Sequence, residues 1–204
     1  MLQDVETGSL WSQVTGECIA GKMEGSVLTL YPSMMTTFAA FGVDYPDGRL
    51  LTKPQPGPDR SPYEWYAADT TALSMFGRVD NFQRLRGKDV VYGVRMDGRQ
   101  TAVAKDLIAS KHLVILDQFT TPVVVTGDST GSSVAAFLLP VGRQRISELE
   151  VVGDTLILGS GDESWNARTG KSQSVRGGDL APVPITSVYW FAWVSFFPET
   201  ELVK

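Results

Sequence analysis

Carboxylates precede a tryptophan at two places in this chain, and such a grouping could act on a sugar. Asp4 and Glu6 precede Trp11, and Asp162 begins a second acidic pair that precedes Trp165. Two carboxylates beside a cleft can perform acid–base catalysis on a glycosidic bond, and indole rings can stack on sugars. Acidic residues before a strand are more often turn residues, and tryptophans more often anchor a core. We therefore favour structural roles and keep carbohydrate binding or activity as a weaker alternative.

Two further features could support chemistry. His112 is the only histidine, so a histidine-rich metal site is excluded and a Ser-His-Asp triad would have to use this residue. Its place after Lys111 and before a predicted strand favours a loop or strand-edge role. The run GDSTGSS, Gly127 to Ser133, could present backbone N–H groups to an anion, but it lacks the lysine of a P-loop and is better explained as a turn. No complete catalytic set is present, so we leave enzymatic activity open, favour a protein that is not an enzyme, and expect no cofactor.

Cysteine and charge content exclude other classes. Cys18 is the only cysteine, so an intrachain disulfide and a thiolate metal cage from this chain are excluded. We expect Cys18 to be a small buried apolar residue in a strand. The 18 basic and 23 acidic residues give a formal charge of −5 without a long run of either sign. This composition argues against nucleic acid as a partner.

Membrane and export signals are weak. The longest apolar stretch, Val183 to Phe197, contains Pro184 and is too short to span a bilayer. Met1 is followed by polar and acidic residues, with no basic region and no apolar region of a signal peptide. We expect a soluble chain and leave its compartment open, with an extracytoplasmic location as an alternative if an upstream segment is missing.

The elements that must position these residues form an internal repeat. The pattern of Thr7 to Leu51 returns at Asp162 to Val203. At constant spacing, broken by one shift of two residues, the following pairs correspond: Trp11 with Trp165, Gly16 with Gly170, Leu28 with Leu180, Phe38 with Trp190, Phe41 with Trp193, and Pro46 with Pro198. Such ordered aromatics and prolines indicate a duplicated unit.

Each copy predicts the same local structure. In the first copy we expect a hairpin around Thr15 and Gly16, a third strand at Val27 to Leu30 and a last strand at Gly48 to Leu51. A helix should lie between these strands, because apolar residues share one helical face before Pro46 ends the run: Met34, Phe38, Phe41 and Tyr45.

The second copy repeats this helix with different aromatics. Trp190, Trp193 and Phe197 share one face, and Pro198 ends the run. Thr186 or Ser187 is the expected N-cap, and Glu201 to Val203 the last strand.

The middle of the chain divides into two kinds of sequence. Lys53 to Pro62 is rich in proline, and we interpret residues 53–88 as a linker or covering loop. From residue 89 the strand signal returns: Asp97 and Gly98 predict a two-residue hairpin between Val90–Met96 and Arg99–Ala104. Further strands are expected at Leu113 to Leu116, Pro122 to Thr126, Ser133 to Leu138, Glu148 to Val152 and Thr155 to Leu158.

These elements predict a mainly β fold with short helices (α+β). Its sheets should be antiparallel meanders or a small barrel-like repeat, internally duplicated. We expect residues 1–52 to be the back half of a first repeat, 53–88 the linker, and 89–204 a second repeat with a front half at 89–140 and a back half at 145–204.

Three stretches carry a family resemblance. They read TGSLWSQVTGECIAG at Thr7 to Gly21, VVYGVRMDGRQTAVAKDL at Val90 to Leu107, and YWFAWVSFFPETEL at Tyr189 to Leu202. The chain resembles the uncharacterised bacterial and archaeal family DUF3179, whose motifs carry no assigned chemistry. The candidate ligand or family-motif residues are Thr7, Gly8, Ser9, Trp11, Asp162, Trp165, Trp190 and Trp193.

The resemblance implies a tandem duplication, of which this chain resembles the back half of copy one and all of copy two. Many members are expected to carry a CPLC-type cysteine segment in the front half. The corresponding place in copy two, Thr126 to Phe137, has no cysteine. We expect a non-catalytic binding or scaffold module of unknown ligand; an accessory protein linked to redox or metal chemistry is the alternative.

Residues 1–52 should also leave a sheet edge unpaired if a front half is missing. Such an edge favours a homo-oligomer or close packing against the second copy.

Overall fold

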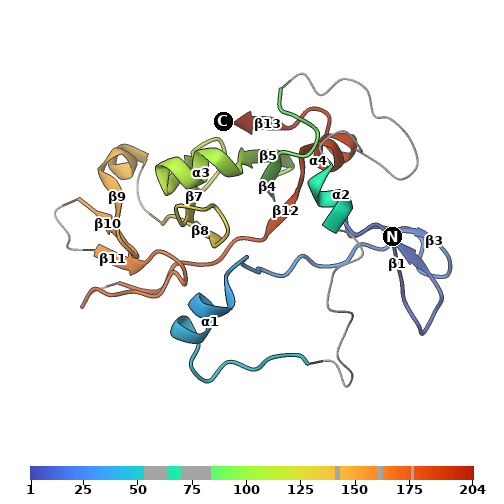
Figure 1. The fold of residues 1–204 in the computed structure, drawn as a ribbon, viewed down its shortest axis with the longest axis horizontal. Coiled ribbons are helices and arrows are strands. Elements are labelled where there is room, and N and C mark those ends of the chain that lie inside the picture. The colour runs from blue at the N-terminus through green and yellow to red at the C-terminus, as the bar shows by residue number, and fades with distance from the viewer. Residues whose placement is uncertain (53–63, 70–83, 141–142, 160–162, 176) are drawn as a thin grey trace.

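The computed structural model describes residues 1–52, 64–69, 84–140, 143–159, 163–175 and 177–204, and Figure 1 shows their arrangement. Among these residues thirteen strands form four sheets, joined by four short α-helices. The predicted mainly β fold with short helices is therefore confirmed. None of the four sheets closes on itself within the described residues, so the barrel-like alternative is wrong. Most of the predicted linker, residues 53–63 and 70–83, lies outside the described part.

The central sheet has the order β12 (Ile185–Tyr189), β4 (Val90–Met96), β5 (Arg99–Ala104), β13 (Glu201–Val203). The predicted hairpin joins β4 to β5, and Asp97 and Gly98 take positive φ angles of 55° and 72° at its turn. Such angles match the twist of the two strands. β13 pairs with β5 in parallel, which a meander does not predict.

Two antiparallel meanders follow this hairpin. Helix α3 (Lys105–Lys111) leads into β6 (Leu113–Leu116), β7 (Val123–Gly127) and β8 (Val134–Leu138). After a 3-10 helix, η1 (Arg143–Glu148), come β9 (Leu149–Val152), β10 (Thr155–Leu158) and β11 (Glu163–Asn166). The predicted strands are confirmed to within a residue or two, whereas α3 and β11 were not predicted.

The meander β6–β8 has an apolar core on each of its faces. Val125 packs with Val103 of the central sheet and with Phe119, all fully buried. On the other face Phe137 packs with Leu156 of β10 and Trp165 of β11. The alternation of apolar residues along β7 and β8 thus joins the central sheet to the β9–β11 sheet.

The N-terminal part is less regular than the sequence predicts. β1 (Leu2–Gln3), β2 (Leu10–Trp11) and β3 (Cys18–Ala20) form a small sheet, so the predicted hairpin is present in shorter form. Val27 to Leu30 is not a strand, because its pairing is limited to one bridge between Glu17 and Val27. Gly48 to Leu51 is not a strand either. α1 (Phe38–Asp44) is present but shorter than predicted, because Met34 lies before its N-cap Thr37 and Met35 pairs with Val134; α2 (Glu64–Ala68) follows.

Helix α4 (Trp190–Phe196) begins differently from the prediction. Thr186 and Ser187 belong to β12, so neither is the N-cap; Tyr189 takes that place without a side-chain hydrogen bond. The N-cap of α1 is Thr37, whose Oγ1 accepts a 3.2 Å hydrogen bond from Ala40 N. β12 runs directly into α4, so the N-cap position falls on Tyr189, the last residue of the strand.

The two helices end alike but pack differently. The C-cap residues Tyr45 and Phe197 have nearly the same φ and ψ, −134° and 71° against −131° and 70°. α4 buries Trp190 and Trp193, whereas α1 buries none of its residues and leaves Phe38 73% exposed.

The two copies of the predicted repeat also share a backbone hydrogen bond to a glycine. Leu28 N donates to Gly16 O, and Leu180 N donates to Gly170 O, both at 2.8 Å. Both glycines have positive φ. These matches agree with the predicted duplication, which stays a prediction.

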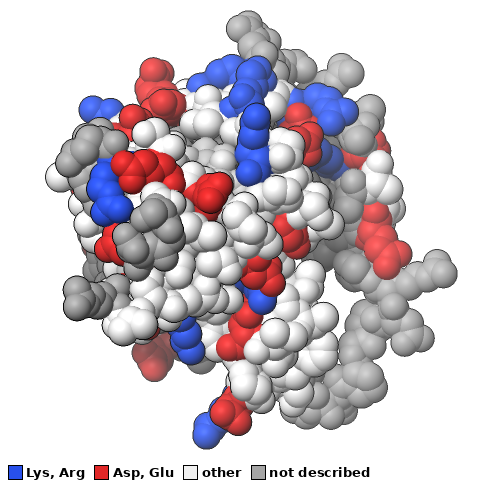
Figure 2. Space-filling model, turned by 90° about the vertical axis from the view of Figure 1, so that its left-hand side faces the viewer, with Lys and Arg blue, Asp and Glu red and all other residues white. Residues whose placement is uncertain are grey.

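The surface carries both signs of charge. On the face shown in Figure 2, Lys and Arg gather toward the top and acidic side chains are scattered across the middle. No described helix is long and apolar enough to cross a membrane.

Candidate functional site

A pocket of about 420 Å³ lies where the N-terminal segment meets the second half of the chain. We call it the α1 pocket. Its wall comes from five separate parts of the sequence: Met34–Thr37 and Ala40; His112; Thr126–Ser129 and Ser133–Ala135; Val151, Gly153 and Asp154; Ala167 and Arg168. Pockets that bind small molecules usually have volumes of about 300–1,000 Å³, so this one has a suitable size.

The N-terminal wall is attached by backbone bonds as well as by side chains. Met35 and Val134 form an antiparallel bridge, so Met35 lies beside β8 and pairs with it at this one residue. Thr37 N donates to Ser133 Oγ at 3.4 Å. Thr36 Oγ1 is shielded from water and has no hydrogen-bond partner. Buried polar atoms almost always have partners, and Thr36 Oγ1 shares this exception with Arg95 Nε and Trp190 Nε1 outside the pocket.

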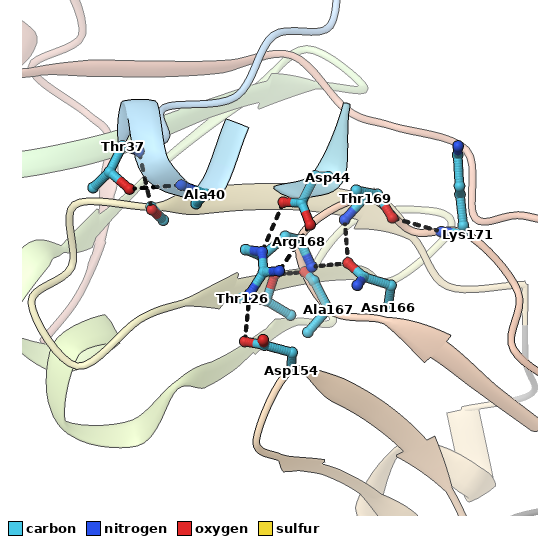
Figure 3. A network of polar contacts seen from close by, with 11 residues as sticks. Thr37, Ala40, Asp44, Thr126, Asp154, Asn166, Ala167, Arg168, Thr169 and Lys171 are labelled. Atoms are coloured by element: carbon cyan, nitrogen blue, oxygen red, sulfur yellow. Dashed lines mark hydrogen bonds and ion pairs between the residues drawn. The ribbon is translucent and has the colours of Figure 1, made fainter. Parts of the chain in front are cut away.

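An ion-pair network that includes the lining residues Arg168 and Asp154 adjoins the pocket, and Figure 3 shows its contacts. Arg168 Nε and Nη2 donate to the two carboxylate oxygens of Asp44, both at 2.7 Å. Arg168 Nη1 lies 2.5 Å from Asp154 Oδ1 on the β9–β10 turn. The side chain of Asp44 is 4% exposed and that of Arg168 22% exposed. The two carboxylates raise the pKa of Arg168, led by the hydrogen bond to Asp44, so the guanidinium stays charged.

His112 is positioned by the end of α3. It is the C-cap of that helix, in the left-handed region at φ 60°, and its backbone N donates to Ile108 O. Its Nδ1 lies 3.2 Å from Gly127 O. A carbonyl oxygen can only accept, so Nδ1 carries the proton in this contact. Nε2 is then the second ring nitrogen, an acceptor in the neutral ring, without a protein partner among the described residues.

The loop after β7 holds a second carboxylate at the pocket. Asp128 Oδ1 accepts hydrogen bonds from Thr130 N, Thr130 Oγ1 and Ser132 N at 2.8–3.0 Å. Burial acts to raise the pKa of Asp128, but the hydrogen bonds from the loop outweigh it and lower the pKa. The run GDSTGSS is therefore a turn, as predicted, and its carboxylate lines the α1 pocket.

Several residues predicted from the family motif form a separate N-terminal network. Asp4 accepts from Trp11 Nε1 at 2.9 Å and from Thr7 N and Oγ1, and Ser9 Oγ lies 2.6 Å from Thr7 Oγ1. Gly8 turns the chain at φ 70°. The hydrogen bond from Trp11, with those from Thr7, lowers the pKa of Asp4 from 3.8 to about 2. These contacts join the turn before β2 to Trp11 of β2, and Ser9 Oγ also accepts from Met23 N at 3.2 Å.

The tryptophans of the motif are buried. Trp165 donates from Nε1 to Gly178 O at 3.0 Å, and Trp193 donates to Thr200 Oγ1 at 3.0 Å. Trp11 and Trp190 are also buried, the latter beneath the guanidinium of Arg84. Asp162 lies outside the described residues, so its pairing with Trp165 stays a prediction.

Metal ligands do not cluster in the described part of the chain, where no three His, Cys, Asp or Glu side chains are grouped. Cys18 is buried in β3, and its Sγ contacts Ala20 O at 3.5 Å.

The α1 pocket was not predicted as a site. Its two sequence signals, His112 and the GDSTGSS turn, were each assigned to a loop, and both assignments fit the structure. What brings them together is the β6–β7 pairing, in which Gly127 N donates to His112 O. Their joint position at one end of a predicted antiparallel strand pair is the signal that could have revealed the site.

Comparison with known proteins gives one match. The family model described as "Protein of unknown function (DUF3179)" matches residues 1–200. No curated protein and no solved structure matches the chain.

Proposed function

We propose that this chain, which belongs to the DUF3179 family of proteins of unknown function, is a non-catalytic binding module whose ligand site is the α1 pocket. The observation that carries the proposal is the convergence of polar side chains from separate parts of the chain on a cavity of ligand size. These side chains include His112, Asp128 and Ser133. A few convergent polar groups in a largely apolar pocket are typical of small-molecule sites.

Binding rather than catalysis is supported by the partners of His112. A histidine that acts as a general base contacts a nucleophile with one ring nitrogen and is oriented by a carboxylate through the other. His112 contacts a backbone carbonyl through Nδ1, and no hydrogen bond joins it to Ser129 or Ser133 among the described residues. These contacts do not supply the activated hydroxyl of a catalytic triad, which supports a binding role for His112.

The apolar part of the wall supports a bound organic molecule. Met34 packs against the core cluster that contains Phe137 and Leu156, so its side chain is held from behind. Val134 and Ala135 are buried strand residues of β8. A pre-formed apolar wall lowers the entropic cost of binding.

The other candidate functions have less support. A carbohydrate site would need exposed indole rings, but Trp11 and Trp165 are buried with their Nε1 atoms bonded inside the protein. A redox or metal role would need accessible soft ligands, and Cys18 is buried. The segment Thr126 to Phe137, which the resemblance matches to the cysteine segment of relatives, does line the α1 pocket in part. This position supports a ligand site next to the segment Thr126 to Phe137 in this chain.

The experiment is a ligand screen with a blocked pocket. A library of small metabolites is screened by ¹⁵N NMR, and shifts at His112, Gly127 and Ser133 identify binders of the α1 pocket. Ala40 lines the pocket, whereas Ala39 on the same helix is exposed. We expect A40L to weaken these binders at least about tenfold, which corresponds to about 1.4 kcal/mol.

The matched control is A39L, which adds the same atoms to the solvent side of α1. It should leave binding unchanged. A library without any binder at these residues, or binders that A40L does not affect, would overturn the proposed function.

A further inference from the structure

From the distribution of hydrogen-bonding groups in the α1 pocket we infer that its ligand is a small organic cation with N–H donors, such as an ammonium or amidinium compound. This inference rests on the proposed function and adds the chemical class of the ligand. It depends on three features of the pocket: the excess of acceptors, the neutralised guanidinium and the net charge of the wall.

Acceptors are in excess among the side chains that line the pocket. His112 Nδ1 donates to Gly127 O, so Nε2 is an acceptor when the ring is neutral. The loop bonds of Asp128 to Thr130 and Ser132 gather on Oδ1, and a carboxylate offers about four acceptor positions, so this group keeps acceptor capacity for a ligand. The hydroxyl groups of Thr36 and Ser129 can either donate or accept, so they do not select between ligands.

The guanidinium of Arg168 does not offset this excess. Each of its three nitrogens faces a carboxylate oxygen, two on Asp44 and one on Asp154. These contacts use three of the five N–H groups, and an anionic ligand on the other two would be repelled by the two carboxylates beside them. Arg168 therefore acts as a fixed part of the wall rather than as an anion receptor.

The net charge of the site points in the same direction. The described lining holds two carboxylates, those of Asp128 and Asp154, and one guanidinium, that of Arg168, which also binds the carboxylate of Asp44; it includes no lysine. A negative potential in a concave site attracts cations and repels anions. A hydrogen bond from a charged N–H donor to a carboxylate is about twice as strong as one between neutral groups. A cation that donates N–H groups thus matches both the charge and the acceptors.

A metal ion fits this pocket less well than an organic cation. The described part of the chain offers no group of three carboxylate or histidine ligands. The volume of about 420 Å³ exceeds that of a bare ion and leaves an apolar wall at Met34 and Val134 in contact with the ligand. An organic cation can use the acceptors and cover this wall at once.

The test uses three molecules of one shape and different charge. Benzamidine is a cation with N–H donors, benzamide is neutral and benzoate is an anion. Dissociation constants are measured by NMR titration of His112 and Ser133 in the full chain. We expect benzamidine to bind at least about tenfold more tightly than benzamide, and benzoate to be the weakest, because tenfold equals about 1.4 kcal/mol.

Two variants test the acceptors. Asp128→Asn should weaken benzamidine about fivefold, by loss of one charge-assisted hydrogen bond, and leave benzamide within twofold. The asparagine side chain retains an Oδ1 acceptor for the loop. Asp154→Asn provides a second test should the loop of the first variant unfold. Glu24→Gln, an exposed carboxylate of the N-terminal hairpin, is the control and should change neither molecule.

The outcomes separate this inference from the proposed function. Tighter binding of benzamide or benzoate than of benzamidine at the same residues would overturn the cation class, while ligand binding by the pocket would stand. Failure of all three to bind while neutral metabolites from the library do bind would also overturn the cation class alone. Tight benzamidine binding that both aspartate variants weaken would support it.

Discussion

The attachment of α1 to the rest of the molecule gives the sharpest prediction. α1 buries none of its own residues, so it cannot be held by apolar packing. Its strongest described link is the bidentate pair of Asp44 with Arg168, at 2.7 Å for both contacts. We expect Asp44→Asn to detach α1 locally while the core stays folded.

The expected loss of stability follows from how far the side chains of Asp44 and Arg168 are exposed to solvent. Loss of one partner costs about 3–5 kcal/mol in a fully buried pair and at most about 1 kcal/mol in an exposed one. The Asp44 side chain is 4% exposed, but that of Arg168 is 22% exposed and keeps Asp154, and the amide of the substituted asparagine still offers one acceptor. We therefore expect a cost of about 1.5 kcal/mol, between these two limits.

Amide hydrogen exchange measures this cost directly. Within α1 the amides of Phe41 and Tyr45 donate to Thr37 O and Phe41 O. Opening of the helix exposes them, so a loss of about 1.5 kcal/mol should speed their exchange roughly tenfold. Amides of β7 should not change.

Asp47→Asn is the matched control, since it removes the same charge from an exposed side chain just beyond α1. It should leave the exchange of Phe41 and Tyr45 within twofold. The reasoning is refuted if Asp44→Asn changes their exchange by less than twofold, or if both variants have the same effect.

Three other predictions concern the core, one carboxylate and the surface. Trp193→Ala should lower the free energy of unfolding in urea by about 4 kcal/mol, because the indole ring is fully buried and its Nε1 donates to Thr200. Phe38→Ala should lower it by about 0.5 kcal/mol or less, because Phe38 is exposed. Equal losses for the two variants would contradict the difference in packing between α4 and α1. An NMR titration of the Asp4 carboxyl should give a midpoint near pH 2. The contribution of this carboxylate to stability is then complete above pH 4 and is lost as the pH falls toward 2. A midpoint near 3.8 would show that the hydrogen bond from Trp11 does not stabilise the charged carboxylate. The exposed apolar side chains of α1 should promote self-association of the chain, which sedimentation would detect. Phe38→Asp should weaken this association. A monomer at every concentration would contradict the prediction.

Local sequence signals predicted the elements whose geometry is decided locally. Asp97 and Gly98 adopt the positive φ angles that a two-residue hairpin requires, and the strands on both sides have the predicted bounds. The helix at Phe38–Asp44 ends before Pro46 as expected, because proline cannot continue it. Such features need no knowledge of distant residues.

Elements that depend on distant partners were predicted less well. Val27 to Leu30 alternates like a strand, but its neighbour along the chain offers one bridge only, so no ladder forms. Thr186 and Ser187 resemble helix caps, yet pairing with Gly93 and Tyr92 on β4 draws them into a sheet. The parallel pairing of β13 joins residues about a hundred positions apart. Strand pairing over such separations cannot be deduced from periodicity.

The candidate site was missed for the same reason. His112 and Asp128 are each ordinary loop residues in their own neighbourhood. The α1 pocket exists because Met35 adds to the edge of β8 and because Arg168 binds Asp44, contacts that link residues about a hundred positions apart. No spacing in the sequence records these contacts.

The burial of the tryptophans also gives the protein a useful optical property. Of the five indole rings, those of Trp11, Trp165, Trp190 and Trp193 are buried, whereas Trp65 on α2 is 59% exposed. A water-soluble quencher should reach Trp65 first and leave the blue-shifted emission of the other four. Replacement of Trp65 by phenylalanine would then leave a fluorescence signal that reports on the folded interior alone, while the quenched fraction in the native chain reports on α2.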